Sequence, residues 1–162
     1  MKIDLSFINN KYFKSMMDEY LDKLFQIDKK IKGIILFGSL ARGEAINSSE
    51  KLSDIDLLVI FYDNEIPEDH RRLTKTKNNL MGLASSGIDS IWTIESYFKK
   101  LIQRKADLIL DCMNEGKILF DPDGFVKEQK IKLFKELKEK GVKRRKNYWI
   151  WPLKQIGNEI EW

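Results

Sequence analysis

Residues 31–61 read IKGIILFGSLARGEAINSSEKLSDIDLLVIF, and this stretch decides the fold. Two apolar, β-branched runs, Ile31–Phe37 and Asp54–Phe61, have the length and composition of buried strands. Between them, residues 40–45 favour a short helix and the polar residues 46–53 favour a loop. The stretch therefore predicts two neighbouring strands joined by a tight turn, a helical segment and a loop.

The rest of the chain predicts further helices and strands in alternation. Apolar residues recur at helical spacing over residues 9–29. The other expected elements are helices over residues 67–84, 95–114 and 125–140, and strands over Ile88–Ile94 and Lys117–Phe120. Residues 143–162 are expected to be irregular. The predicted class is α/β (α+β), a small mixed β-sheet flanked by helices.

Two carboxylates stand at the start of the second strand, Asp54 and Asp56. Residues two apart on a strand point to the same face, so both side chains project together. Adjacent carboxylates resist joint ionisation, and a divalent cation such as Mg²⁺, which prefers carboxylates, waters and phosphates, removes that conflict. The alternative is that Asp54 ends a loop and Asp56 is solvated. The apolar residues 57–61 that follow argue against simple exposure.

The turn Gly38-Ser39 directly follows the first strand. A glycine–serine turn that enters a helix exposes backbone N–H groups and a hydroxyl, which bind phosphate readily. Arg42 could steady a triphosphate through its forked donors. The alternative is an ordinary strand-to-helix turn with a surface arginine.

A third carboxylate is expected because a two-metal site holds one ion on the phosphates and another on the attacking oxygen. Asp89 is the best candidate, since it enters an apolar strand directly after a Ser-Ser-Gly break. Asp107 and Asp111 compete for the role, but both fall on a predicted helix where surface solvation explains them better. His70, the only histidine, is expected to be a solvated surface residue.

The combination of Gly38-Ser39, Asp54-Ile55-Asp56 and a later single aspartate resembles the polymerase-beta-type nucleotidyltransferase superfamily. The Gly-Ser-x-Ala-Arg-Gly-Glu form is most similar to its minimal members in archaea and bacteria. The resemblance covers about residues 30–120, within an expected nucleotidyltransferase domain of residues 1–142 that precedes a basic, aromatic tail at 143–162. One departure is the segment between Ser39 and Asp54, which is longer than usual and could reshape a pocket at residues 46–52.

The resemblance implies catalysis and metal binding by Asp54, Asp56 and Asp89, and nucleotide binding by Gly38, Ser39 and Arg42. It implies a Mg²⁺-dependent transferase, with two ions, that moves a nucleoside monophosphate from a nucleoside triphosphate, ATP by default, and releases pyrophosphate. The acceptor stays open. One alternative is an antitoxin-like subunit that covers or AMP-modifies a helical, toxin-like partner. Another is a non-catalytic nucleotide-sensing or nucleic-acid-binding module, against which the three carboxylates argue.

Composition excludes some classes of protein. No apolar run is long enough to span a membrane, and the start of the chain has no signal-peptide pattern. The single cysteine, Cys112, is expected to be buried and inert, which suits a cytoplasmic location. The net charge of +4 permits a polyanionic partner without requiring one.

The positive charge is concentrated near the C-terminus, in the run Lys143–Lys146. Aromatic residues follow it: Tyr148, Trp149, Trp151 and Trp162. This pattern could bind single-stranded nucleic acid through phosphate contacts and stacking. The favoured alternative is that the tryptophans pack onto the domain or onto a second copy in a homo-oligomer, with the basic run solvated.

Overall fold

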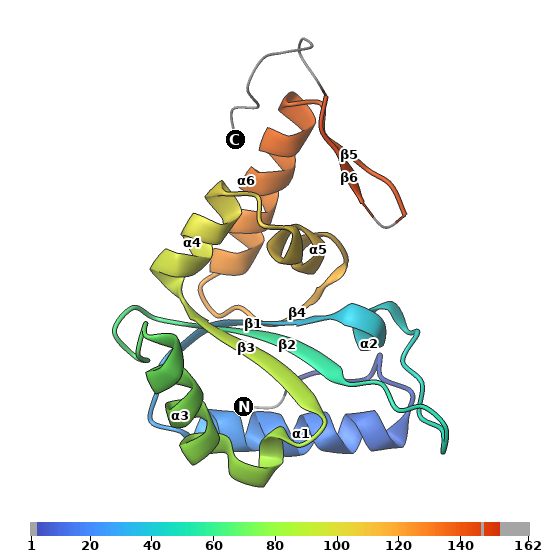
Figure 1. Cartoon of the computed structure of the whole chain (residues 1–162), viewed down its shortest axis with the longest axis vertical. Helices are drawn as coiled ribbons and strands as arrows, with labels where there is room; N and C mark the ends of the chain where they lie inside the picture. The colour runs from blue at the N-terminus through green and yellow to red at the C-terminus, as the bar shows by residue number, and fades with distance from the viewer. Residues whose placement is uncertain (1–2, 147, 153–162) are drawn as a thin grey trace.

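The computed structural model describes residues 3–146 and 148–152. Its main feature is a mixed four-stranded sheet in the order β3-β2-β1-β4 (Figure 1). The strands are β1 (Ile31–Phe37), β2 (Ile55–Phe61), β3 (Ile88–Ile94) and β4 (Lys117–Phe120). Strand β1 runs antiparallel to both β2 and β4, whereas β2 and β3 are parallel. The predicted mixed sheet is therefore present, with three of its four strands at the expected bounds.

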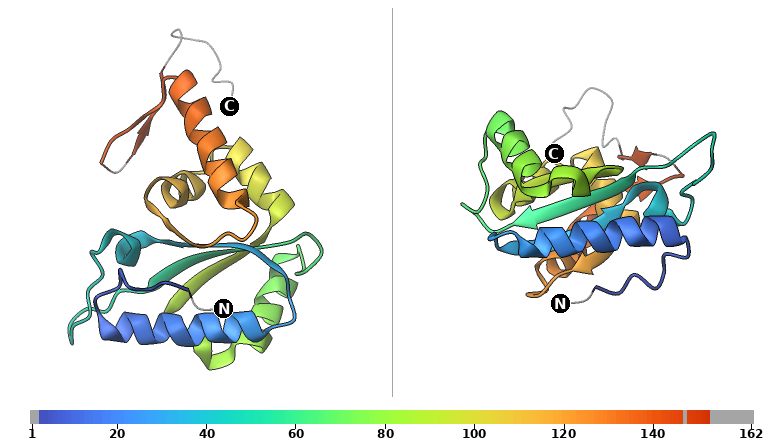
Figure 2. Two further views of the ribbon diagram at one scale, coloured as in Figure 1. Left: turned by 180° about the vertical axis from the view of Figure 1, so that it is seen from behind. Right: turned by 90° about the horizontal axis from the view of Figure 1, so that it is seen from below.

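Helices cover both faces of this sheet (Figures 1 and 2). One face packs against α1 (Lys11–Gln26), α3 (His70–Met81) and the 3₁₀ turn η1 (Gly82–Ser85). The other packs against α4 (Glu95–Gln103), α5 (Asp107–Glu115) and α6 (Phe125–Glu139), while the short α2 (Gly38–Arg42) follows β1 directly. Because a strand covered on both sides buries all its side chains, β2 reads as an almost continuous apolar run.

The two faces of the sheet belong to two separate hydrophobic cores. Leu57 and Val59 of β2 join the core under α1, whereas Leu58 and Ile60 join the core under α4, α5 and α6. Cys112 lies in this second core at 1% exposure, and burial, with smaller effects from Asp111 and Asp56, raises the pKa of its thiol to about 12. The expectation of a buried cysteine is confirmed. Among the described residues, no helix is long and apolar enough to cross a membrane.

Residues 143–162 were predicted to be irregular, but within the described part of this segment β5 (Lys143–Arg144) and β6 (Trp149–Ile150) pair as a short hairpin. Trp149 donates its Nε1–H to Asp111 Oδ1 at 3.0 Å and packs against Phe134, and Arg144 Nη2 lies 3.1 Å from the same carboxylate oxygen. Asp111 was expected to be solvated, and instead it anchors the hairpin to α5.

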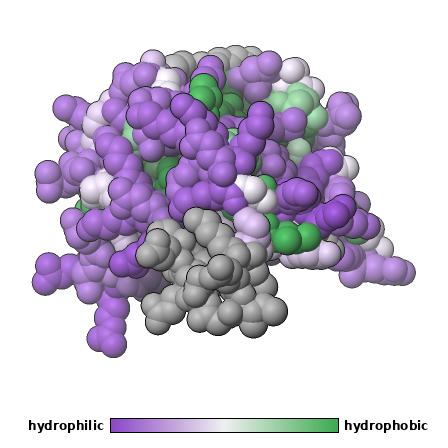
Figure 3. Space-filling model, turned by 90° about the horizontal axis from the view of Figure 1, so that it is seen from above, coloured by the Kyte–Doolittle hydropathy of each residue, from purple (hydrophilic) through white to green (hydrophobic). Residues whose placement is uncertain are grey.

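Two of the C-terminal tryptophans pack onto the domain, as the favoured alternative predicted. Trp149 and Trp151 pack, partly buried, against the core of α5 and α6. Tyr148 is 60% exposed, and the end of the molecule seen from above carries mainly hydrophilic side chains (Figure 3). Trp162 lies outside the described residues, as do residues 153–161. Nucleic-acid binding by the basic run stays a prediction.

The single helix expected over residues 95–114 is two helices, α4 and α5. The break falls at Lys105, whose φ of 54° lies in the left-handed region that non-glycine residues rarely adopt. Its side chain is 3% exposed, and its ammonium donates to Glu136 Oε2 on α6 at 2.7 Å and to the carbonyl of Ile102 at 3.2 Å. A contact with a distant helix thus stabilises a turn that the local sequence does not encode.

Replacing Lys105 with methionine is expected to destabilise the fold. The change leaves Glu136 with only its exposed partner Lys140 and takes the ammonium donor away from the carbonyls of Ile102 and Gln103, a loss of about 1–3 kcal/mol. A domain of this size loses about 2–4 °C of Tm per kcal/mol. The matched control is Lys140→Met, which removes the exposed partner of the same carboxylate and should change the free energy of unfolding by less than about 0.5 kcal/mol. Equal effects of the two variants in thermal melts would contradict this account.

Candidate active site

The predicted carboxylates meet at one end of the parallel strand pair. Asp56 of β2 lies directly opposite Asp89 of β3 in the register, at the spacing of about 4.8 Å between neighbouring strands. Asp54 precedes β2 by one residue and therefore lies on the same face as Asp56. That face is the one covered by α4, α5 and α6, because Leu58 and Ile60 continue the same alternation into their core. Asp54 and Asp89 are exposed and Asp56 is half-buried.

Gly38 packs directly against the carboxylate of Asp56. A Cβ added at Gly38 would lie 2.0 Å from Oδ2 and 2.8 Å from Cγ of that side chain, well inside van der Waals contact. The φ of Gly38 is 69°, a conformation that disfavours any residue with a side chain. Both the space and the backbone angle thus require glycine here, and the glycine–serine turn and the carboxylates form one contiguous site.

The charges of this site act on one another. Burial raises the pKa of Asp56 above its ordinary value, the negative charges of Asp89 and Asp54 raise it further, and Arg42 lowers it. The half-buried carboxylate therefore lacks sufficient positive charge among its protein neighbours. A cation held between these groups would relieve the repulsion.

The donor set fits Mg²⁺ in chemistry but is not a preformed cage. Among residues 3–146 and 148–152, no group of three His, Cys, Asp or Glu side chains is already arranged to hold a metal ion. Asp54, Asp56 and Asp89 nevertheless offer only oxygen ligands and share one face and one edge. Mg²⁺ usually takes one or two carboxylates and completes its shell with water and phosphate, so such a set suffices.

Comparison with known proteins identifies the fold family. The family model described as "Polymerase beta, Nucleotidyltransferase" matches residues 19–124, more than half of the chain. The chain belongs to this family. It is a nucleotidyltransferase of the polymerase beta type, as its sequence predicted. Comparison with curated proteins gave no match.

Several solved structures are similar to this nucleotidyltransferase. A toxin–antitoxin structure with AMP-PNP has 19% identity and a TM-score of 0.49, covering 75% of this chain and 86% of its own. A mutant toxin–antitoxin MntA–HpeT has 16% identity and a TM-score of 0.46 at the same coverage, 75% and 86%. A nucleotidyltransferase described as putative, from Sulfolobus solfataricus, has 13% identity and a TM-score of 0.44, covering 71% and 91%. The family assignment rests on the family model.

The nucleotide-binding candidates of this nucleotidyltransferase lie beside the carboxylates. Gly38 and Ser39 begin α2, and the carbonyl of Ser39 accepts from the backbone of Glu44 at 2.8 Å. Arg42 ends this helix and pairs with Glu44 at 2.7 Å and with Glu115 at 3.0 Å. Arg42 is thus already held by two carboxylates through Nε and Nη1, which leaves the N–H groups of Nη2 to bind a phosphate.

One charged neighbour of the site was missed from the sequence. Lys77 of α3 is half-buried, donates its ammonium to the carbonyl of Ser90 at 2.6 Å, and interacts electrostatically with Asp89. Burial lowers the pKa of Lys77, while Asp89 opposes that shift. A lysine on a predicted polar helix gives no sequence signal of such a contact, because the packing of α3 against the edge of β3 creates it.

Asparagine at Asp56 is expected to stabilise the metal-free nucleotidyltransferase. Because the folded-state pKa of Asp56 is raised above 3.8, the folded protein binds more protons than the unfolded chain just above that pH. Stability therefore falls as pH rises through this window, and ionised Asp56 destabilises the fold at neutral pH. Asp56→Asn removes this penalty.

Thermal melts in EDTA between pH 4 and pH 8 measure this effect. The Tm of Asp56→Asn should exceed that of the parent at pH 7, and the difference should shrink toward pH 4. Asp22→Asn, at an exposed position on α1, is the matched control and should follow the parent at every pH. A lower Tm for Asp56→Asn at pH 7 would show that the ionised carboxylate is stabilised by contacts within the protein.

Proposed function

We propose that this nucleotidyltransferase transfers a nucleoside monophosphate, AMP from ATP, to an acceptor with release of pyrophosphate, and that Asp54, Asp56 and Asp89 hold the Mg²⁺ it needs. The observation that carries the proposal is the register pairing of Asp56 with Asp89, beside a glycine that no other residue can replace without displacing Asp56. Bound Mg²⁺ would neutralise phosphate charge and acidify the attacking hydroxyl.

The residues of the chain would position and orient the reactants. Gly38 leaves the backbone open for close approach of the phosphates, and Ser39 contributes a hydroxyl beside them. Arg42 would donate its remaining Nη2 N–H groups to a phosphate oxygen while Glu44 and Glu115 hold the rest of the guanidinium. Asp89 would accept the proton of the acceptor hydroxyl, since it is exposed where an acceptor can reach it.

The site supports transfer of a nucleotidyl group more than a binding role alone. A sensor of nucleotides needs contacts with base and phosphates, and it has no need for paired carboxylates that oppose the negative charge of its ligand. Here burial, and then the negative charges of Asp89 and Asp54, raise the pKa of Asp56. Such a destabilising cluster is typical of catalytic sites.

Labelled ATP tests the proposal. The purified protein is incubated with Mg²⁺, extract and ATP labelled at either the α- or the γ-phosphate. Label from the α-phosphate should enter an acceptor fraction in a Mg²⁺-dependent reaction, with pyrophosphate as the other product. Transfer of the γ-label would show a kinase, and tight ATP binding that needs no metal and yields no product would show a sensor.

The same experiment distinguishes the classes of acceptor. Sensitivity of the labelled fraction to ribonuclease, to protease or to neither separates an RNA end, a protein and a small molecule. A labelled small helical protein that co-purifies with the chain would support the antitoxin-like alternative. Asp22→Asn serves as the active control and Asp56→Asn as the inactive one.

A further inference from the structure

Strand β3 is an edge of the sheet. Two hydrogen bonds show which of its residues point their backbone N–H and C=O groups toward β2 and which point them outward. Ile55 of β2 donates to the carbonyl of Gly87, so the odd-numbered residues of β3 direct their backbone groups toward β2. The carbonyl of Ser90 accepts instead from Lys77 on the outer side. Along a strand, the backbone groups of successive residues point to opposite sides. Because Ser90 points outward, the N–H and C=O of Trp92 and the N–H of Ile94 point outward as well.

The two halves of this outer edge have different neighbours. At Ser90 the half-buried ammonium of Lys77 occupies the outer side and prevents another strand from pairing there. At Trp92 and Ile94 the outer side opens into a pocket of about 350 Å³. Lysine on an edge strand is a common protection against unwanted pairing, and here it protects only the end next to Asp89.

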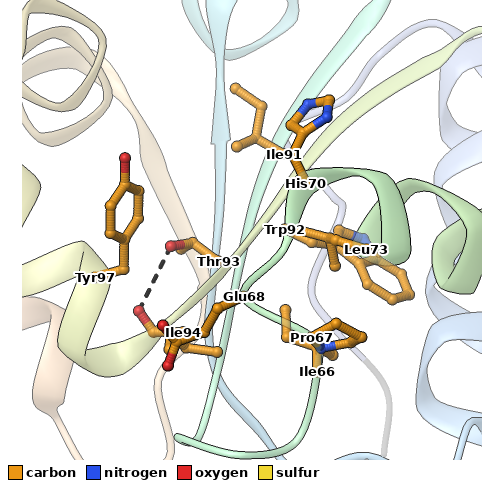
Figure 4. A pocket seen from close by; sticks show the side chains of 10 residues that line it. All are labelled: Ile66, Pro67, Glu68, His70, Leu73, Ile91, Trp92, Thr93, Ile94 and Tyr97. Carbon is orange, nitrogen blue, oxygen red and sulfur yellow. Dashed lines mark hydrogen bonds between the residues drawn. The ribbon is translucent and has the colours of Figure 1, made fainter.

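The pocket has the form of a slot for one more strand. Its floor is the stretch from Ile91 to Ile94, one wall is Tyr97 of α4, and the opposite wall includes Leu73 of α3 (Figure 4). Side chains from both helices flank this edge. Trp92, Thr93 and Ile94 are themselves only 4–6% exposed, so a ligand reaches their backbone through the pocket. Tyr97 is 49% exposed, so the apolar wall faces solvent.

One carboxylate lines the pocket. Glu68 is the only Asp, Glu, Lys or Arg among the described residues that line it, and it is exposed. The segment 63–69 that borders it contains four acidic residues and no basic one, and it is followed at the start of α3 by His70, which also lines the pocket, and by Arg71 and Arg72. Charge complementarity therefore favours a basic occupant, and it disfavours a second copy of this chain, whose own acidic segment would approach this one.

We propose that the outer edge of β3 at Trp92–Ile94, between α3 and α4, binds an extended basic peptide segment of a partner protein as an added β-strand. Main-chain hydrogen bonds to the free edge would supply affinity, and the apolar pocket with Glu68 would select an apolar side chain next to a Lys or Arg. The proposal does not depend on the chemistry of the active site, because Asp89 lies at the opposite end of β3 and stays free.

Two synthetic peptides test the inference on the full chain. Acetyl-KVKVKV-amide is the basic probe and acetyl-EVEVEV-amide is its acidic counterpart. Backbone amide exchange followed by NMR should show protection gained at Trp92 and Ile94 with the basic probe. Ile91 and Thr93, already bonded to β2, should gain none. This alternating pattern is specific to strand addition, and equal protection of all four amides, or none, would overturn the proposal.

Charge reversal provides the matched variants. Glu68→Lys should weaken binding of the basic probe by at least about tenfold and strengthen binding of the acidic one. Glu19→Lys, an equal change at an exposed position on α1, should alter neither.

Light scattering completes the test: a dimer of the peptide-free chain with Trp92 and Ile94 already protected would show a second copy in the slot and overturn the basic-partner assignment. Nucleotidyl transfer by Glu68→Lys should equal that of the parent, so loss of peptide binding is distinguishable from failure of the proposed catalysis.

Discussion

Asparagine at Asp56 is expected to lower kcat/KM for nucleotidyl transfer by at least about a thousandfold, roughly 4 kcal/mol of transition-state stabilisation. The amide keeps the shape of the side chain beside Gly38 but removes its negative charge. Transfer to the α-phosphorus depends mainly on positioning and charge neutralisation, and single preorganised electrostatic groups at such sites are worth about 10²–10³-fold. Asp56 should exceed that range because the other carboxylates, both exposed, cannot replace it.

The assay must separate lost chemistry from a lost fold. Asp56→Asn should keep the far-UV circular dichroism of the parent and should have a higher Tm than the parent in EDTA. Addition of Mg²⁺ with ATP should raise the Tm of the parent but not that of the variant, because binding to the folded state stabilises it by mass action. Asp22→Asn carries the same chemical change on α1 and should match the parent in rate, Tm and ligand response.

Two results for Asp56→Asn would contradict a catalytic role for this carboxylate. If Asp56→Asn transfers label at the parental rate to the same acceptor, the register pair Asp56–Asp89 is not the catalytic centre. If the rate falls only because Tm falls, the carboxylate has a structural role. A stable, folded and inactive variant is the expected result.

The sequence predicted the strands well because each is a continuous apolar run between polar or glycine-rich breaks. Strands β1, β3 and β4 have the expected bounds, and β2 begins one residue late, at Ile55. Local alternation also placed Asp54 and Asp56 on one face. It could not show that Asp89 pairs with Asp56, since that depends on the register of two parallel strands joined by a long connection.

The helices show the limit of local signals. Helix α3 was expected from residue 67 but begins at His70, where Asp69 accepts from the backbone of Arg72 as an N-cap. No glycine or proline at Lys105 indicates the break in the sequence. The break is stabilised by the hydrogen bond from Lys105 to Glu136, which lies far along the chain. The hairpin of β5 and β6 likewise depends on Asp111, which in sequence is one more helical carboxylate. In each case a specific polar contact overrides or refines the apolar pattern.

Alanine at Gly38 is expected to reduce both stability and activity. The backbone φ of 69° costs a residue with a Cβ about 1–2 kcal/mol. The new methyl group would also lie 2.0 Å from Oδ2 of Asp56, so the carboxylate must move away. A displacement of about 1 Å at a catalytic group can cost about 10²-fold in rate, and we expect a loss of at least that size.

A second glycine separates these two effects. Gly124 has a φ of 71° and open space where its Cβ would be, so Gly124→Ala carries similar backbone strain without a clash. Both variants should lose Tm, by about 2–4 °C per kcal/mol, yet only Gly38→Ala should lose transfer activity and its response to Mg²⁺ with ATP. The double variant Gly38→Ala, Asp56→Asn should be no slower than Asp56→Asn alone, because the clash acts through the carboxylate that is already disabled. Full activity in Gly38→Ala would mean that the carboxylate of Asp56 need not occupy the place where the fold holds it.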